Sequence, residues 1–188
     1  WKNWATDWSS LLTIPFHLTI GIISVYVVLG ISYRFSKYYK MEALPNSLTA
    51  LFVFLCVVGV PQSINEGSFI DVSGLGASSM FAAIIIALLV IEINHWMIIK
   101  NLKISMPKGV PPMVAGPFEV LLPLVVNTIL FIVLDQVIFM ITGSGLTNLV
   151  FTIFSPLISA TASLPSMLFI VVLTVVFWFF GIHGDNMV

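Results

Sequence analysis

Charge is scarce in this chain of 188 residues, and so is cysteine. Charged residues make up only 8% of the sequence, hydrophobic residues make up 59%, and the mean hydropathy is +1.11. Soluble domains carry about a quarter charged residues. The shortage of charge therefore excludes an ordinary soluble domain and predicts an integral membrane protein.

The low count of basic residues also excludes a nucleic-acid-binding surface. Seven Lys and Arg against eight acidic residues give a net charge of −1, which cannot neutralise a long phosphate track. The single cysteine, Cys56, cannot form an internal disulfide. It lies within an apolar run, so we interpret it as a small hydrophobic residue and not as an activated thiolate that carries a phosphoryl group.

Long hydrophobic stretches fill most of the sequence and predict an all-α, polytopic membrane helical bundle. We expect about five transmembrane spans, because each stretch approaches the length of about 20 residues that a bilayer requires. A further apolar segment, 148–161, is short and contains Pro156. We expect it to break there and either to lie flat near the outer surface or to dip partly into the membrane. The predicted spans are 11–33, 48–62, 77–99, 118–142 and 168–180.

Six of the seven basic residues fall in two loops, 34–40 and 100–108. Two helices separate these loops, so both must lie on the same side of the membrane. Cytoplasmic loops carry an excess of Lys and Arg. This side is therefore predicted to be cytoplasmic, with the acidic loop 63–76 outside.

Several polar residues within the spans allow more than one interpretation. Asn46 or Ser47 is a plausible N-cap after Pro45, and Pro123 is expected to kink the fourth span. Glu92 and His95 are interpreted as anchors at the membrane interface. Asp135 is either a structural charge with a partner, which we favour, or part of an ion relay.

The final stretch is predicted to hold the functional site, because a solid hydrophobic run ends there in two glycines around a histidine. Backbone broken at membrane depth must be buried in protein or line a wet cavity. A neutral imidazole at His183 can donate one hydrogen bond and accept another. A metal site needs several ligands, so we predict neither a metal nor a cofactor. The candidate substrate-binding residues are Trp178, Gly181, His183, Gly184 and Asn186.

Two motifs carry a resemblance to a known family. The first is Met106-Pro107-Lys108-Gly109-Val110-Pro111-Pro112, and the second is Phe180-Gly181-Ile182-His183-Gly184-Asp185-Asn186. Together they resemble the membrane (C) component of bacterial phosphotransferase-system sugar permeases of the lactose, cellobiose and diacetylchitobiose type. One departure is Gly116-Pro117-Phe118, where the family usually shows a pattern ending in Ser-Phe.

The resemblance implies a dimeric, ten-span permease in the bacterial inner membrane that carries a β-linked disaccharide. A cytoplasmic B component with a phosphocysteine would phosphorylate the sugar, so the C component itself holds no phosphoryl group. His183 matches the family histidine that contacts the sugar. By the same analogy, residues 1–142 form scaffold and dimerisation helices, 143–162 a surface linker, and 163–188 the start of the sugar-transport domain.

Two further expectations complete the picture. The chain begins at Trp1 and stops two residues after Asn186, so it is expected to be a piece of a longer protein. The alternative function is an ion-coupled secondary transporter that uses Asp135 and His183 as a relay.

Overall fold

The computed structural model is helical apart from one small β-hairpin in the part of the chain that it describes. That part comprises residues 8, 11, 13–59, 62–64, 67–69, 72–104, 112–161, 165–168, 171, 172 and 175. The helices are α2 (Ile23–Tyr38), α3 (Ala43–Val58), α4 (Met80–Ile99), α5 (Pro112–Glu119), α6 (Leu121–Thr142) and α7 (Leu146–Thr161). Strands β1 (Gln62–Ile64) and β2 (Gly67–Phe69) pair antiparallel between α3 and α4.

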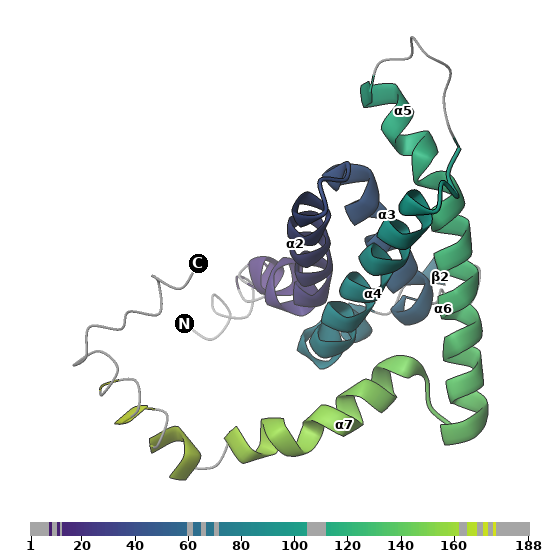
Figure 1. The fold of residues 1–188 in the computed structure, drawn as a ribbon. Helices are drawn as coiled ribbons and strands as arrows, with labels where there is room; N and C mark the ends of the chain where they lie inside the picture. Colours follow the sequence, from purple (N-terminus) through teal and green to yellow (C-terminus); the bar gives the residue numbers. More distant parts are fainter. Residues whose placement is uncertain are drawn as a thin grey trace. The chain divides into compact units, whose positions relative to one another are not determined.

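Helices α2, α3 and α4 pack against one another, and α6 packs along α3 and α4 (Figure 1). The packed face of α2 repeats every four residues as Ser24, Val28, Ser32 and Ser36, all buried. Small side chains let helix backbones approach closely. Within lipid there is no hydrophobic driving force between helices, so this close packing drives their association. Ser24 also donates a hydrogen bond of 2.6 Å to the Gly76 carbonyl and so ties α2 to the segment before α4.

Among the described residues, three helices are long and apolar enough to cross a membrane: Thr13–Tyr38, Ala77–Ile99 and Ala115–Thr142. The predicted span 77–99 is confirmed, and the first span continues five residues beyond the expected end. Helix α3 has 16 residues, or about 24 Å, less than the ~30 Å hydrocarbon core. Most of the predicted span 168–180 lies outside the described residues, so the count of five spans stays a prediction.

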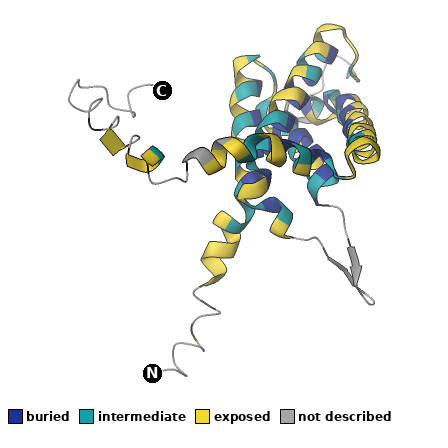
Figure 2. Ribbon diagram, turned by 90° about the horizontal axis from the view of Figure 1, so that it is seen from below, coloured by how far each residue is buried: buried dark blue, intermediate teal, exposed yellow. Residues whose placement is uncertain are grey.

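The exposed surface of these helices is apolar, as expected for contact with lipid. Figure 2 shows the buried residues on the inner faces of the packed helices and the exposed residues on their outer faces. On α6, Ile129, Val133, Met140 and Ile141 are all more than half exposed. In water, such a surface would cause aggregation. In a bilayer, it is the surface that contacts the lipid chains.

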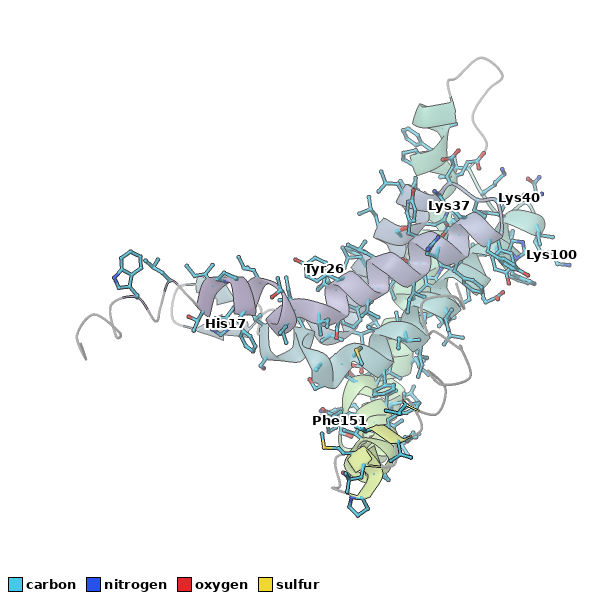
Figure 3. All side chains as sticks on the ribbon, turned by 90° about the vertical axis from the view of Figure 1, so that its left-hand side faces the viewer. His17, Tyr26, Lys37, Lys40, Lys100 and Phe151 are labelled. Atoms are coloured by element: carbon cyan, nitrogen blue, oxygen red, sulfur yellow. The ribbon has the colours of Figure 1, made fainter. Side chains whose placement is uncertain are left out.

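The basic side chains gather at one end of the bundle, as the loop positions predicted. Figure 3 shows Lys37, Lys40 and Lys100 together where α2 and α4 end, while His17 lies toward the other end of the first span. The two basic loops therefore lie on the same side. By the positive-inside rule this end faces the cytoplasm.

Two local expectations at α3 and α7 are wrong. Helix α3 begins at Ala43, upstream of Pro45, because proline fits the first turn of a helix where its missing N–H is not needed. Asn46 and Ser47 do not cap it; their side chains donate to the carbonyls of Glu42 and Ala43. Helix α7 likewise continues through Pro156 to Thr161, so the chain is not broken there.

The fourth span is interrupted near the expected proline. Pro123 lies inside α6, but the interruption falls at Val120, between α5 and α6. Pro123 has no N–H to donate to the carbonyl of Glu119, four residues before it, and α5 ends at Glu119. The chain as a whole divides into two compact units, Trp1–Phe151 and Thr152–Val188.

Candidate functional site

The predicted sugar-binding residues Trp178, Gly181, His183, Gly184 and Asn186 all lie outside the described residues. Their assignment stays a prediction. The polar groups that the structure does place belong to the first unit, where they form an amide chain between helices, an aromatic and charged cluster at the cytoplasmic end, and a carboxylate at the opposite end.

Three asparagines from three helices form a chain of hydrogen bonds through the bundle. Asn94 of α4 donates from Nδ2 to Oδ1 of Asn46 on α3, at 2.8 Å. Asn127 of α6 donates to Oδ1 of Asn94, also at 2.8 Å, and to the Pro123 carbonyl at 2.9 Å. All three side chains are at most 1% exposed. The chain therefore links α3, α4 and α6 through three buried side chains.

The amide chain leaves one acceptor without a partner. Among the described residues, Oδ1 of Asn127 is buried and makes no hydrogen bond, although a carbonyl oxygen of this kind can accept two. Burying such a group without a partner costs about 1–3 kcal/mol. A shift of α6 relative to α4 would break the hydrogen bond between Asn127 and Asn94 and leave further buried amide groups unpaired. The amide chain therefore restrains the relative positions of these helices.

An aromatic and charged cluster joins α2 to α4 at the cytoplasmic end. The Tyr39 hydroxyl donates to Oε1 of Glu92 at 2.5 Å. The Tyr39 ring stacks on the His95 ring, with centroids 3.8 Å apart and planes 12° apart. Glu92 and His95 sit three residues apart on one face of α4, so both can reach the same tyrosine. The hydrogen bond to Glu92 raises the pKa of Tyr39 above its usual 10.0.

A cavity of about 410 Å³ opens beside this cluster. Its polar walls carry charges of both signs, from Lys40, Glu42, Lys103 and Glu119, and the buried Asn46 lies at its inner side. Lys103 and Glu119 form an ion pair of 3.0 Å that connects the loop after α4 to the end of α5. The cavity offers hydrogen-bond donors and acceptors to a polar group at the cytoplasmic face.

Asp135 holds the start of α7 at the other end of the unit. Its Oδ1 accepts a hydrogen bond of 2.7 Å from the backbone N–H of Leu146, the first residue of α7. A carboxylate at a helix N-terminus satisfies a free N–H and is favoured by the helix dipole. Asp135 therefore has a hydrogen-bond partner, as the favoured interpretation expected, and its role as a structural charge stays a prediction.

Sequence reasoning missed the amide chain. The sequence suggests Asn46 as a helix cap and indicates no role for Asn94 or Asn127. The available signal was the presence of amides within apolar spans, since polar side chains there usually hydrogen-bond across helices. Tyr39 was also missed as the partner of Glu92 and His95, because 53 residues separate the bonded pair in sequence.

Comparison with known proteins identifies the family. The family model described as "Phosphotransferase system, EIIC" matches residues 1–188. The oligo-beta-mannoside-specific EIIC component of the phosphotransferase system in Bacillus subtilis is 34% identical over 185 residues, which cover 96% of this chain and 42% of that protein. The cellobiose-specific EIIC component of Geobacillus stearothermophilus is 29% identical, over 100% of this chain and 44% of that protein.

The structural comparison agrees with the sequence matches. The crystal structure of the transporter ChbC, the IIC component from the N,N'-diacetylchitobiose-specific phosphotransferase system, superimposes with a TM-score of 0.80 at 29% identity. The match covers 95% of this chain and 44% of that one. The chain thus spans less than half the length of these relatives. It is an integral membrane protein, and it belongs to the EIIC family of the phosphotransferase system.

Proposed function

We propose that this chain forms part of a phosphotransferase-system sugar permease that translocates a β-linked disaccharide across the bacterial inner membrane. The observation that carries the proposal is the match of the EIIC family model to the whole chain. The substrate class is supported by relatives named for oligo-beta-mannoside, cellobiose and lactose, and by the ChbC neighbour named for N,N'-diacetylchitobiose. All of these sugars are β-linked.

The sugar would be phosphorylated on arrival by a cytoplasmic B component that carries a phosphocysteine. Phosphoryl transfer requires the attacking sugar oxygen and the leaving cysteine sulfur to lie in line with the phosphorus, so the sugar must reach an opening at the cytoplasmic end, where Lys37, Lys40 and Lys100 gather. Phosphorylation removes free sugar from the inner side. Net uptake then needs no ion gradient.

The site is assigned to the predicted helix break around His183. In this proposal the neutral imidazole donates to one sugar hydroxyl and accepts from another, while Asn186 and the backbone at Gly181 and Gly184 supply further polar contacts. Trp178 offers its ring face to the apolar face of the sugar. The residue types carry this assignment, together with the motif 180–186.

We assign residues 1–142 to the scaffold and dimerisation helices, 143–162 to a surface linker and 163–188 to the start of the sugar-transport domain. The division of the structure into compact units at Phe151 and Thr152 falls within the linker and supports this arrangement. Five spans and an interfacial helix in this chain would then be part of a ten-span, homodimeric permease. The amide chain between α3, α4 and α6 would keep the scaffold rigid while the sugar-transport domain moves.

Sugar binding by the whole permease that contains this chain tests the proposal. The purified protein in detergent is titrated with cellobiose, lactose and diacetylchitobiose, without a phosphorelay partner. Binding of one disaccharide that is lost in His183→Ala and retained in His17→Ala supports both the substrate class and the site. His17 is a matched control because it is exposed and lies far from the basic end. Unchanged binding in His183→Ala would refute the site.

The ion-coupled alternative has no support from the comparisons, and a transport assay separates it from the permease. In cells with an intact phosphorelay, a protonophore should leave uptake largely unaffected, whereas loss of the B component should abolish it. Uptake that collapses with the protonophore and survives without the B component would favour an ion-coupled carrier.

A further inference from the structure

An open groove runs along α2 at its cytoplasmic half. It has a volume of about 700 Å³. Six of its lining residues come from one face of α2 at intervals of one, three or four residues, and the seventh is Leu88 of α4. They are Val27, Gly30, Ile31, Arg34, Phe35, Tyr38 and Leu88. The groove is therefore apolar over most of its length and has one cation near its cytoplasmic end.

Gly30 forms the hollow of the groove. A Cβ placed on Gly30 would meet no heavy atom within 4 Å, so the space beside it is not filled by the described protein. Gly30 also has an ordinary helical conformation within α2. Neither the backbone conformation nor packing within the described residues therefore requires a glycine at this position. The absent side chain leaves space on the surface of α2 for another molecule.

Within the described part of the chain, the Arg34 guanidinium has no carboxylate partner. Among the described residues the salt bridge that the structure contains joins Lys103 to Glu119, and Arg34 is exposed. Lys37, one turn further along α2, lies over the Tyr33 ring at 4.7 Å and does not line the groove. A permanently charged, planar guanidinium at the membrane surface favours an anion that can accept two parallel hydrogen bonds, such as a phosphate.

The dimensions of the groove match one lipid chain. Val27 to Tyr38 spans about 17 Å along the helix axis, close to the ~15 Å thickness of one leaflet of the hydrocarbon core. Its charged end faces the cytoplasmic leaflet, which is rich in anionic lipid. A soluble anion would use Arg34 but leave the apolar hollow at Gly30 empty, whereas a phospholipid would fill both.

We propose that an anionic phospholipid of the cytoplasmic leaflet binds in this groove, with one acyl chain beside Gly30 and its phosphate on the Arg34 guanidinium. Ile31 and Phe35 of α2, with Leu88 of α4, contact the chain. Tyr38, which is 74% exposed, lies at headgroup level, where tyrosine is enriched. The lipid thereby contacts both α2 and α4. Its negative headgroup charge complements the basic residues at the cytoplasmic end of the bundle.

Native mass spectrometry of the whole permease tests this site. The protein in detergent is mixed with phosphatidylglycerol or phosphatidylcholine of identical acyl chains, and the bound fractions are compared. We expect phosphatidylglycerol to bind about fivefold more tightly, the size of one favourable basic contact with an anionic lipid. Arg34→Gln should remove this preference, and Arg34→Lys should retain part of it.

Matched variants separate a built site from general attraction to a basic surface. Lys37→Gln removes the same charge one turn away and should leave the preference unchanged. Gly30→Leu fills the hollow and should reduce the binding of both lipids, while thermal stability reports that the variant is folded. Equal losses in Arg34→Gln and Lys37→Gln, or no headgroup preference in the parent protein, would overturn the proposal.

A second copy of the chain is the competing occupant. Gly30→Cys on a Cys56→Ser background places one thiol in the groove. With lipid bound there, oxidation should give no disulfide-linked dimer. Efficient cross-linking between copies in phosphatidylglycerol-containing membranes would show that protein fills the groove and would overturn the lipid assignment.

Discussion

The Asn94 side chain donates a hydrogen bond of 2.8 Å to Oδ1 of Asn46 and so joins α4 to α3 through two buried amides. The same amide accepts from Asn127 of α6. One side chain therefore determines the relative positions of three helices. In a membrane, where apolar surfaces give little specificity, such a contact selects one packing among many of similar energy.

Replacement of Asn94 should destabilise the bundle more than replacement of Asn127. Asn94→Leu removes two interhelical hydrogen bonds and leaves Oδ1 of Asn46 unpaired, at a cost of about 1–3 kcal/mol in the free energy of unfolding. Asn127→Leu removes one such bond and also removes an acceptor that is already unpaired, so its cost should be smaller. Reversible unfolding in mixed detergent micelles measures both values.

Gln136→Leu is the control for these variants, because Gln136 is an exposed amide on α6. It should change stability little. A loss in Gln136→Leu as large as that in Asn94→Leu would mean that the hydrophobic substitution itself, and not the loss of the amide chain, causes the effect.

Substitutions at Asp135 distinguish a helix cap from an ion relay. Asp135→Ala should lower the free energy of unfolding by about 0.5–2 kcal/mol, because the Leu146 N–H loses its acceptor. Asp135→Asn keeps an acceptor oxygen and should recover most of this loss, with sugar uptake close to that of the parent. Abolished uptake in a stable Asp135→Asn protein would indicate that the carboxylate must titrate, as an ion relay requires.

The ionisation of Tyr39 should report its contact with Glu92. Their hydrogen bond raises the pKa of the Tyr39 phenol above 10.0, so its phenolate absorbance should appear at higher pH than that of a free tyrosine. A raised pKa means that the contact stabilises the fold fully below the unfolded pKa and that this stability is lost as pH rises through the folded pKa. The change should therefore be confined to alkaline pH.

The spectrum of the parent minus that of Tyr39→Phe isolates this group from the other tyrosines. In Glu92→Gln the midpoint should shift down toward 10.0, because the carboxylate charge that opposes phenolate formation is gone. An unchanged midpoint in Glu92→Gln would contradict the hydrogen bond as the main cause.

Two glycines should respond oppositely to the same substitution. Gly143 ends α6 with φ of +73°, a conformation that costs an L-residue about 1–2 kcal/mol, so Gly143→Ala should destabilise. Gly30 lies inside α2 with open space beside it, so Gly30→Ala should be neutral or stabilise by about 0.5–1 kcal/mol. Thermal unfolding of the two variants checks this contrast, and equal effects would contradict it.

The sequence predicted the properties that a single helix carries within itself. The span at 77–99 could be placed because hydropathy is a local sum, and Lys37, Lys40 and Lys100 could be assigned to one end because span lengths and loop charges fix the topology. The family could be proposed from the motifs 106–112 and 180–186, whose residues lie next to one another in the chain. The assignment of a sugar site around His183 rests on the second motif alone.

Relationships between helices could not be read in the same way. Asn46 resembles a cap locally, yet its Oδ1 accepts from a residue 48 positions away, and Glu92 finds its donor on another helix. The groove at Gly30 includes Leu88 only because α2 packs on α4. Composition and periodicity thus determined that the chain enters the membrane and which side its charges face. Tertiary packing alone decided which polar groups meet, because a hydrogen bond forms only where two helices bring donor and acceptor within about 3 Å.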